Sequence, residues 1–119
     1  MKTITSLLVA SLVLCAAGNC LGADARNGKL LFASQNLGGG TSGKTCLTCH
    51  EHGRDLSPET LTRKQYLVMG NPVANLAGVV NFCIEVALRG EGIAENSKEM
   101  NDLLAYLPLF IKANSSGPQ

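Results

Sequence analysis

The sequence contains no tryptophan, and aromatic residues make up only 4% of its 119 positions. It also lacks any run of basic residues, and its formal net charge is only +1. Nucleic-acid-binding surfaces need clustered Lys and Arg side chains, often with aromatic side chains for stacking, so nothing points to nucleic-acid binding. Alternating β patterns and internal repeats are missing as well. These absences predict a small all-α domain.

The first 23 residues have the layout of a secretory signal peptide. Lys2 supplies a positive start, an apolar run extends from about Leu7 to Ala17, and small residues end at Ala23. The apolar run is short for a transmembrane helix. Cleavage after Ala23 is the favoured interpretation, with lipidation at Cys15 or Cys20 and an uncleaved anchor as alternatives. The chain is therefore expected to be exported, to the periplasm or an equivalent compartment, with no membrane span in the mature form.

The mature chain would comprise a domain at residues 24–113 and a disordered tail at residues 114–119. Without Lys2 it carries nine basic and nine acidic residues and is formally neutral. Three cysteines remain, at positions 46, 49 and 83. An odd number does not suit a simple disulfide framework in an oxidising compartment. A domain of this size commonly needs a disulfide, metal or cofactor to stabilise its core, so a non-disulfide role for the cysteines is expected.

Capping residues and apolar spacing predict about four helices. These are expected at residues 24–33, from Ser57 to Val68 or Met69, from Asn75 to Leu88, and from Asn96 or Ser97 onward. Pro108 should kink or end the last helix. Residues 37–44 (LGGGTSGK) superficially resemble a phosphate-binding loop, but no strand precedes them, and a flexible loop is expected.

The segment Thr45–His50 reads TCLTCH, a Cys-x-x-Cys-His motif. In an exported protein this motif is typical of covalent haem attachment, in which Cys46 and Cys49 bind the porphyrin and His50 ligates the iron. One alternative is a zinc site built from the three cysteines with His50 or His52. Another is a redox dithiol, which needs a βαβ setting that this chain does not offer. One haem c is therefore the expected cofactor.

With this motif, the chain resembles small class I cytochromes c over roughly residues 24–111. The resemblance is carried by the motif, the helix before it and the terminal-helix sequence EMNDLLAYL at residues 99–107. It implies a helical domain wrapped around one covalent haem. The sequences NFCIE at residues 81–85, ALRG at 87–90 and SKEM at 97–100 are similar to single-haem units of thiosulfate dehydrogenases and related sulfur-oxidising cytochromes. In that family the cysteine of such a segment ligates the catalytic haem, which implies an iron-ligating role for Cys83.

The second axial ligand is left open by the residues themselves. The candidates are Met69, Met100, Cys83, His52 and Asn81. Met100 lies on an apolar helix face and is expected in the core, while His52 is too close to His50 to reach the opposite face. The remaining alternatives are Cys83, Met69, and another ligand or an open site. A thiolate would lower the iron potential and a thioether would raise it.

The favoured function is that of an exported monohaem cytochrome that carries single electrons between redox protein partners and is not itself an enzyme. No triad, paired carboxylates or second haem motif occurs in the sequence. The alternative is a haem subunit of a sulfur-compound oxidising enzyme with chemistry at a Cys83-ligated haem, and a gas-binding role is a third possibility. Arg89 is a candidate partner for a haem propionate or, more simply, a surface residue.

Overall fold

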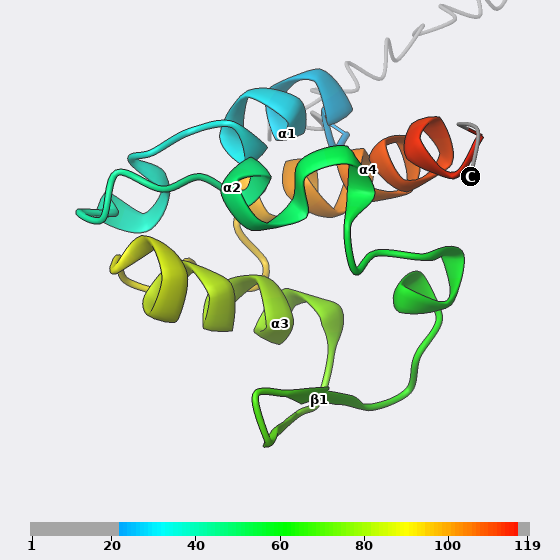
Figure 1. Ribbon diagram of the computed structural model, residues 1–119. Helices are drawn as coiled ribbons and strands as arrows, with labels where there is room; N and C mark the ends of the chain where they lie inside the picture. The colour runs from blue at the N-terminus through cyan, green and yellow to red at the C-terminus, as the bar shows by residue number, and fades with distance from the viewer. Residues whose placement is uncertain (1–21, 117–119) are drawn as a thin grey trace, which may run out of the picture.

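The first and last helices of the domain pack against each other (Figure 1). The computed structural model describes residues 22–116. The helices are α1 (Ala25–Phe32), α2 (Cys46–His50), α3 (Leu76–Cys83) and α4 (Lys98–Ser115), with 3-10 turns η1 (Leu37–Gly39), η2 (Glu51–Gly53) and η3 (Pro58–Leu61), and a π-helical segment η4 (Ile84–Leu88). Two short strands, β1 (Tyr66–Val68) and β2 (Asn71–Val73), form an antiparallel pair.

Helices α1 and α4 approach closely because Gly28 has no side chain. A β-carbon at Gly28 would collide with the backbone carbonyl of Asp102 and lie 2.8 Å from the β-carbon of Tyr106. Beside this crossing, the ring of Phe32 packs against Tyr106 and Phe110, with centroid separations of 5.6 and 4.8 Å. Three of the five aromatic residues of the chain therefore meet where the two helices pack together.

The predicted helix starts are confirmed at three places. The Asp24 carboxylate accepts hydrogen bonds from the backbone N–H groups of residues 26 and 27, which caps α1. Asn75 caps α3 by accepting from Gly78 N at 2.7 Å, and Ser97 caps α4 by accepting from Met100 N at 3.2 Å. Each cap satisfies an N–H group that has no partner within its own helix.

The prediction of a helix from Ser57 to Val68 or Met69 is wrong beyond its first turn. Ser57 does cap a turn, but that turn ends at Leu61, and the chain then forms the β1–β2 hairpin. Its two-residue connection, Met69 and Gly70, has positive φ at both positions (48° and 80°), the conformation that matches the twist of a tight hairpin. Tyr and Val favour a pleated strand over a helix at these positions. The domain is mostly helical with a small sheet, rather than strictly all-α.

The helix predicted from Asn75 to Leu88 is confirmed in extent, although its last five residues form the π-helical segment η4. It ends at Arg89, which adopts the left-handed conformation (φ 54°) common at helix C-termini. The glycine-rich segment before α2 is tied to this helix end. Thr41 N donates to the Leu88 carbonyl at 2.9 Å, and the Ser42 hydroxyl donates to the Ala87 carbonyl at 2.8 Å.

Helix α4 starts where expected and buries Met100, as predicted, together with Leu103 and Leu107. Pro108 does not end it. The proline is exposed, so its missing N–H costs one hydrogen bond on the solvent side while the packed side of the helix continues. The helix runs through Ser115 and so extends two residues into the predicted tail, whereas residues 117–119 and 1–21, with most of the predicted signal peptide, lie outside the described residues. Over residues 22–116, no helix has the length and apolar character needed to cross a membrane.

Candidate haem-attachment site

Helix α2 is a short helix whose start is fixed by two threonines. Thr45 and Thr48 form a capping box, in which the Thr45 backbone N–H donates to the Thr48 hydroxyl at 3.0 Å. The helix holds Cys46 and Cys49 three residues apart, so both thiols project from the same side. The short helix therefore presents the two cysteines of the motif together.

His50 ends α2, and one of its two ring nitrogens is occupied by the backbone. Nδ1 lies 3.0 Å from the carbonyl oxygen of Arg54. A carbonyl only accepts, so Nδ1 carries the proton and the neutral ring keeps its lone pair on Nε2. This tautomer and this fixed ring orientation are what a histidine ligand to a metal requires.

The loop that carries the Arg54 carbonyl turns at two residues with positive φ and packs against α4. His52 and Gly53 have φ values of 55° and 73°, which turn the chain back toward His50. A β-carbon on Gly53 would lie 2.8 Å from the β-carbon of Asn114 near the end of α4. The terminal helix therefore supports the hydrogen bond that orients the His50 ring.

All three cysteines of the described chain are free thiols. Cys49 is exposed, whereas Cys46 and Cys83 are half-buried. Burial, followed by the neighbouring thiol of Cys83, raises the pKa of Cys46 to about 11. Burial and the nearby Cys49 also raise the pKa of Cys83. Cys46 and Cys83 thus share a half-buried setting, although they belong to different helices.

Cys83 is positioned by α3, which lies opposite α2 in the fold (Figure 1). Asn81, two residues earlier, makes two hydrogen bonds to the backbone of Ile93. Its side chain donates to the Ile93 carbonyl and accepts from the Ile93 N–H, each at 2.8 Å. Asn81 is therefore committed to holding the loop that follows η4.

The other candidate ligands lie in different environments. Met69 sits in the turn of the hairpin with its side chain 79% exposed, and Met100 is fully buried in the core. The His52 side chain is 88% exposed and lies 3.6 Å from the Glu51 carboxylate, as expected of a surface histidine. Arg89 is exposed. The structure thus holds Cys46, Cys49 and His50 on one short helix, leaves Met69 on the surface and places Cys83 on a separate helix.

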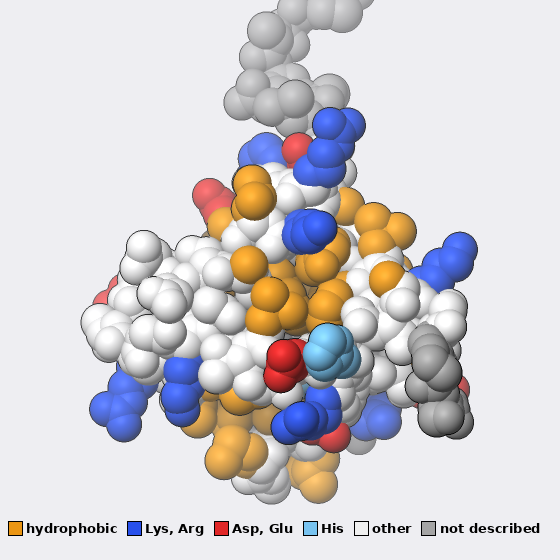
Figure 2. Space-filling view, turned by 45° about the horizontal axis from the view of Figure 1, so that its top comes forward, with side chains coloured by type: hydrophobic (Ala, Val, Ile, Leu, Met, Phe, Trp, Pro, Cys, Tyr) orange, Lys and Arg blue, Asp and Glu red, His pale blue; other side chains and the backbone are white. Residues whose placement is uncertain are grey.

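Helix α3 and its π-helical end carry a half-buried row of apolar residues. It consists of Leu76, Val79, Val80, Cys83 and Ala87. The fully buried residues of this helix are instead Ala77, Ile84 and Leu88, which form part of the core or lie beside it. Apolar side chains also remain visible in the middle of one face of the molecule, between polar and charged groups (Figure 2).

Two features of the structure were not found by sequence reasoning. The Arg54 carbonyl is a backbone group with no sequence signal of its own. The second is Asp102, which is fully buried and accepts three hydrogen bonds. Its spacing of four residues from Lys98 is a readable sign of an ion pair on a helix, but not of burial.

The comparisons with known proteins add no assignment. No protein-family model matches the chain, and no curated protein or solved structure matches it. Within residues 22–116, no group of three or more His, Cys, Asp or Glu side chains is arranged to hold a metal ion by itself.

Proposed function

We propose that this chain is an exported monohaem c-type cytochrome that carries single electrons between redox protein partners. The observation that carries the proposal is the hydrogen bond from His50 Nδ1 to the Arg54 carbonyl, directly beside two free thiols on one turn of helix. The Cys-x-x-Cys-His motif alone shows only that these residues are close in sequence. The hydrogen bond at Nδ1 in addition orients the imidazole and leaves Nε2 for a ligand.

The donor set fits a haem c. Cys46 and Cys49 would form thioether bonds to the two vinyl groups, and His50 would bind the iron through Nε2. The haem supplies the chemistry of reversible one-electron transfer. The half-buried apolar stripe of α3 would exclude water from the cofactor and lower the local dielectric constant, which is how a protein tunes a redox potential.

Cys83 is the favoured second ligand. It is half-buried, while Met69 is exposed in the hairpin turn and would have to be carried inward with the hairpin. A cysteine thiolate would hold the iron at low potential. The raised pKa of free Cys83 does not oppose this role, because metal binding itself favours the deprotonated thiol.

The same cysteine supports the alternative function, a haem subunit of a thiosulfate-type sulfur-compound oxidising enzyme. Chemistry at a Cys83-ligated haem would then require thiosulfate-dependent reduction of the protein. One measurement separates the two functions, namely reduction of the protein by thiosulfate. A carrier should not be reduced by thiosulfate without a partner protein, whereas an enzyme subunit should be reduced by it, and Cys83→Ala should abolish that reduction.

The test of the proposal is the covalent retention of haem. The protein is expressed with its own N-terminal segment in a host that exports and matures c-type cytochromes, purified, and extracted with acidified acetone. We expect the red colour to stay with the polypeptide, with a mass increase of one haem. Loss of the pigment into the acetone, or an exported protein without haem, would overturn the proposal.

A further inference from the structure

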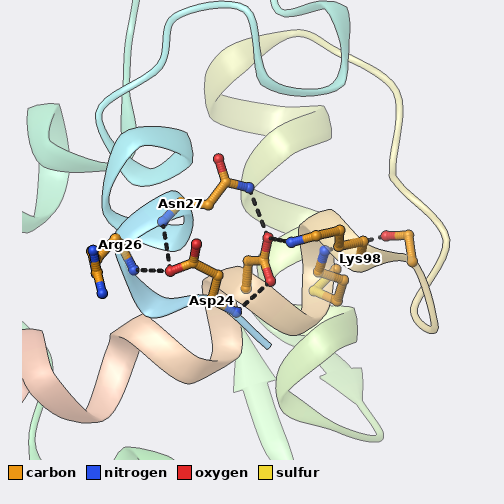
Figure 3. A network of polar contacts seen from close by, with 7 residues as sticks. Asp24, Arg26, Asn27 and Lys98 are labelled. Carbon is orange, nitrogen blue, oxygen red and sulfur yellow. Dashed lines mark hydrogen bonds and ion pairs between the residues drawn. The ribbon is translucent and has the colours of Figure 1, made fainter. Parts of the chain in front are cut away.

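The backbone nitrogen of Asp24 is bound by a buried carboxylate from the other end of the chain. Asp24 N donates to Asp102 Oδ1 at 2.7 Å, although 78 residues separate the two (Figure 3). The second oxygen, Asp102 Oδ2, accepts from Asn27 Nδ2 at 2.7 Å and from Lys98 Nζ at 2.6 Å. Both carboxylate oxygens are therefore used, and the side chain is completely shielded from solvent.

Asp24 is also the first residue expected in the mature chain. We infer that Asp102 is a docking site for the α-ammonium group that signal-peptide cleavage between Ala23 and Asp24 would create. This inference rests on the export step of the proposed function, but not on the haem. In the precursor the Asp24 nitrogen is a neutral amide, and after cleavage the same atom would carry a positive charge at the same hydrogen-bond distance from a carboxylate.

The setting around the Asp24 nitrogen favours an added positive charge. Asp102 Oδ1 lies 2.7 Å from this nitrogen. The Lys98 ammonium, the opposing charge, bonds to the other oxygen of the same carboxylate at 2.6 Å. Arg26 contributes only its backbone N–H to the Asp24 side chain in this network.

The cleavage point itself is accessible. Gly22 and Ala23 are exposed and lie outside the α1 helix, whose first residue is Ala25. Ala23 borders a shallow hollow that is also lined by Lys98, Asn101 and Asp102. Removal of the preceding chain would leave the α1 cap intact, because that cap is made by the Asp24 side chain and not by residues before it.

The consequence is a coupling between processing and stability. The amide hydrogen bond would become a charge-assisted one, and such bonds are stronger and shorter than neutral ones. The ammonium would tie the start of α1 to α4 at the crossing where Gly28 contacts Asp102. The processed domain should therefore be more stable than an otherwise identical domain that still carries residues before Asp24.

The test is a double-mutant cycle on the exported protein. One chain begins at Asp24 and the other retains Ala23 as its first residue, which moves the charge by about 3.8 Å but keeps the amide hydrogen bond. Each is made with Asp102 and with Asp102→Asn, and unfolding by denaturant is compared. We expect the Asp24-first chain to have an unfolding equilibrium constant about fivefold lower than the Ala23-first chain, and no such difference in Asp102→Asn.

The outcomes are separable from those of the haem proposal. N-terminal mass analysis that finds a mature chain beginning elsewhere, or an Asp24-first advantage that persists in Asp102→Asn, would overturn the docking site, whatever the haem content. If Asp102→Asn does not fold, NMR titration of the wild-type α-amino group decides. A pKa raised above the ordinary value of about 7.7–8.0 supports the docking site, and an ordinary value overturns it.

Discussion

His50 Nδ1 lies 3.0 Å from the carbonyl oxygen of Arg54, so the loop after α2 orients the histidine that the motif places beside Cys49. This relationship links the fold to the chemistry. The loop turns back at His52 and Gly53, and α4 packs against it. The terminal helix therefore stabilises the domain and also supports the loop that orients the His50 ring.

The first prediction concerns the two histidines. His50→Ala should remove the proximal ligand while the thioethers to Cys46 and Cys49 keep the haem attached, so the low-spin spectrum should be lost and restored by added imidazole. His52→Ala is the matched control, because that side chain is 88% exposed and bonds only to Glu51, and its absorption spectrum should equal that of wild type. Equal spectral effects of the two substitutions would contradict the assignment of His50.

The second prediction concerns the opposite side of the iron. If Cys83 is the ligand, Cys83→Ala should change the low-spin EPR signal and raise the midpoint potential, on the order of 0.1 V within the roughly 0.8 V that axial ligands span. Met69→Ala should leave both unchanged, because its side chain lies exposed in the hairpin turn. The reverse pattern would assign the role to Met69 and require the hairpin to move inward.

The third prediction tests the helix crossing. Gly28→Ala places a β-carbon against the Asp102 carbonyl and Tyr106, and it should lower the free energy of unfolding by about 1–3 kcal/mol, as overpacking typically does. Lys29→Ala, on the exposed side of the same helix, should change it by less than about 0.5 kcal/mol. Denaturant unfolding measures both variants. A Gly28→Ala protein as stable as wild type would show that α1 and α4 are not packed at this distance.

The fourth prediction concerns acid stability. Hydrogen bonds from the Asp24 N–H, Lys98 and Asn27 hold the pKa of Asp102 at about 2, below its ordinary 3.8. A carboxyl whose pKa is lower in the folded state contributes stability above pH 3.8 and loses it as the pH falls to about 2.

The variant Asp102→Asn should therefore be less stable than wild type at pH 6, and the gap should narrow steadily between about pH 4 and pH 2. Glu99→Gln removes the same charge from an exposed position of the same helix and serves as the control. A stability gap for Asp102→Asn that stays constant over this pH range would mean that the carboxylate does not hold the network together.

Several parts of the fold and site were predictable because their signals are local. Asp24, Asn75 and Ser97 cap helices through short-range hydrogen bonds that their residue types favour. The spacing of the motif placed Cys46, Cys49 and His50 together without any tertiary information. The burial of Met100 followed from helical periodicity.

The hairpin and the burial of α3 were not predictable in the same way. The segment after Leu61 has no strong alternation, and its conformation is decided by the Met69–Gly70 turn, whose left-handed φ at a methionine is an uncommon choice. The apolar stripe of α3 stays half-buried, with Leu76, Val80 and Ala87 at the edge of the core, while Ile84 and Leu88 fill the core. Which apolar side of a helix packs inward depends on its neighbours, and sequence periodicity does not specify those.

The most direct test of the central claim is a count of reactive cysteines in the denatured, reduced protein after export and maturation. Alkylation followed by peptide mass analysis should modify Cys83 alone and should find the Cys46–Cys49 peptide unalkylated and heavier by one haem. Alkylation of all three cysteines, with no haem mass on any peptide, would contradict the account.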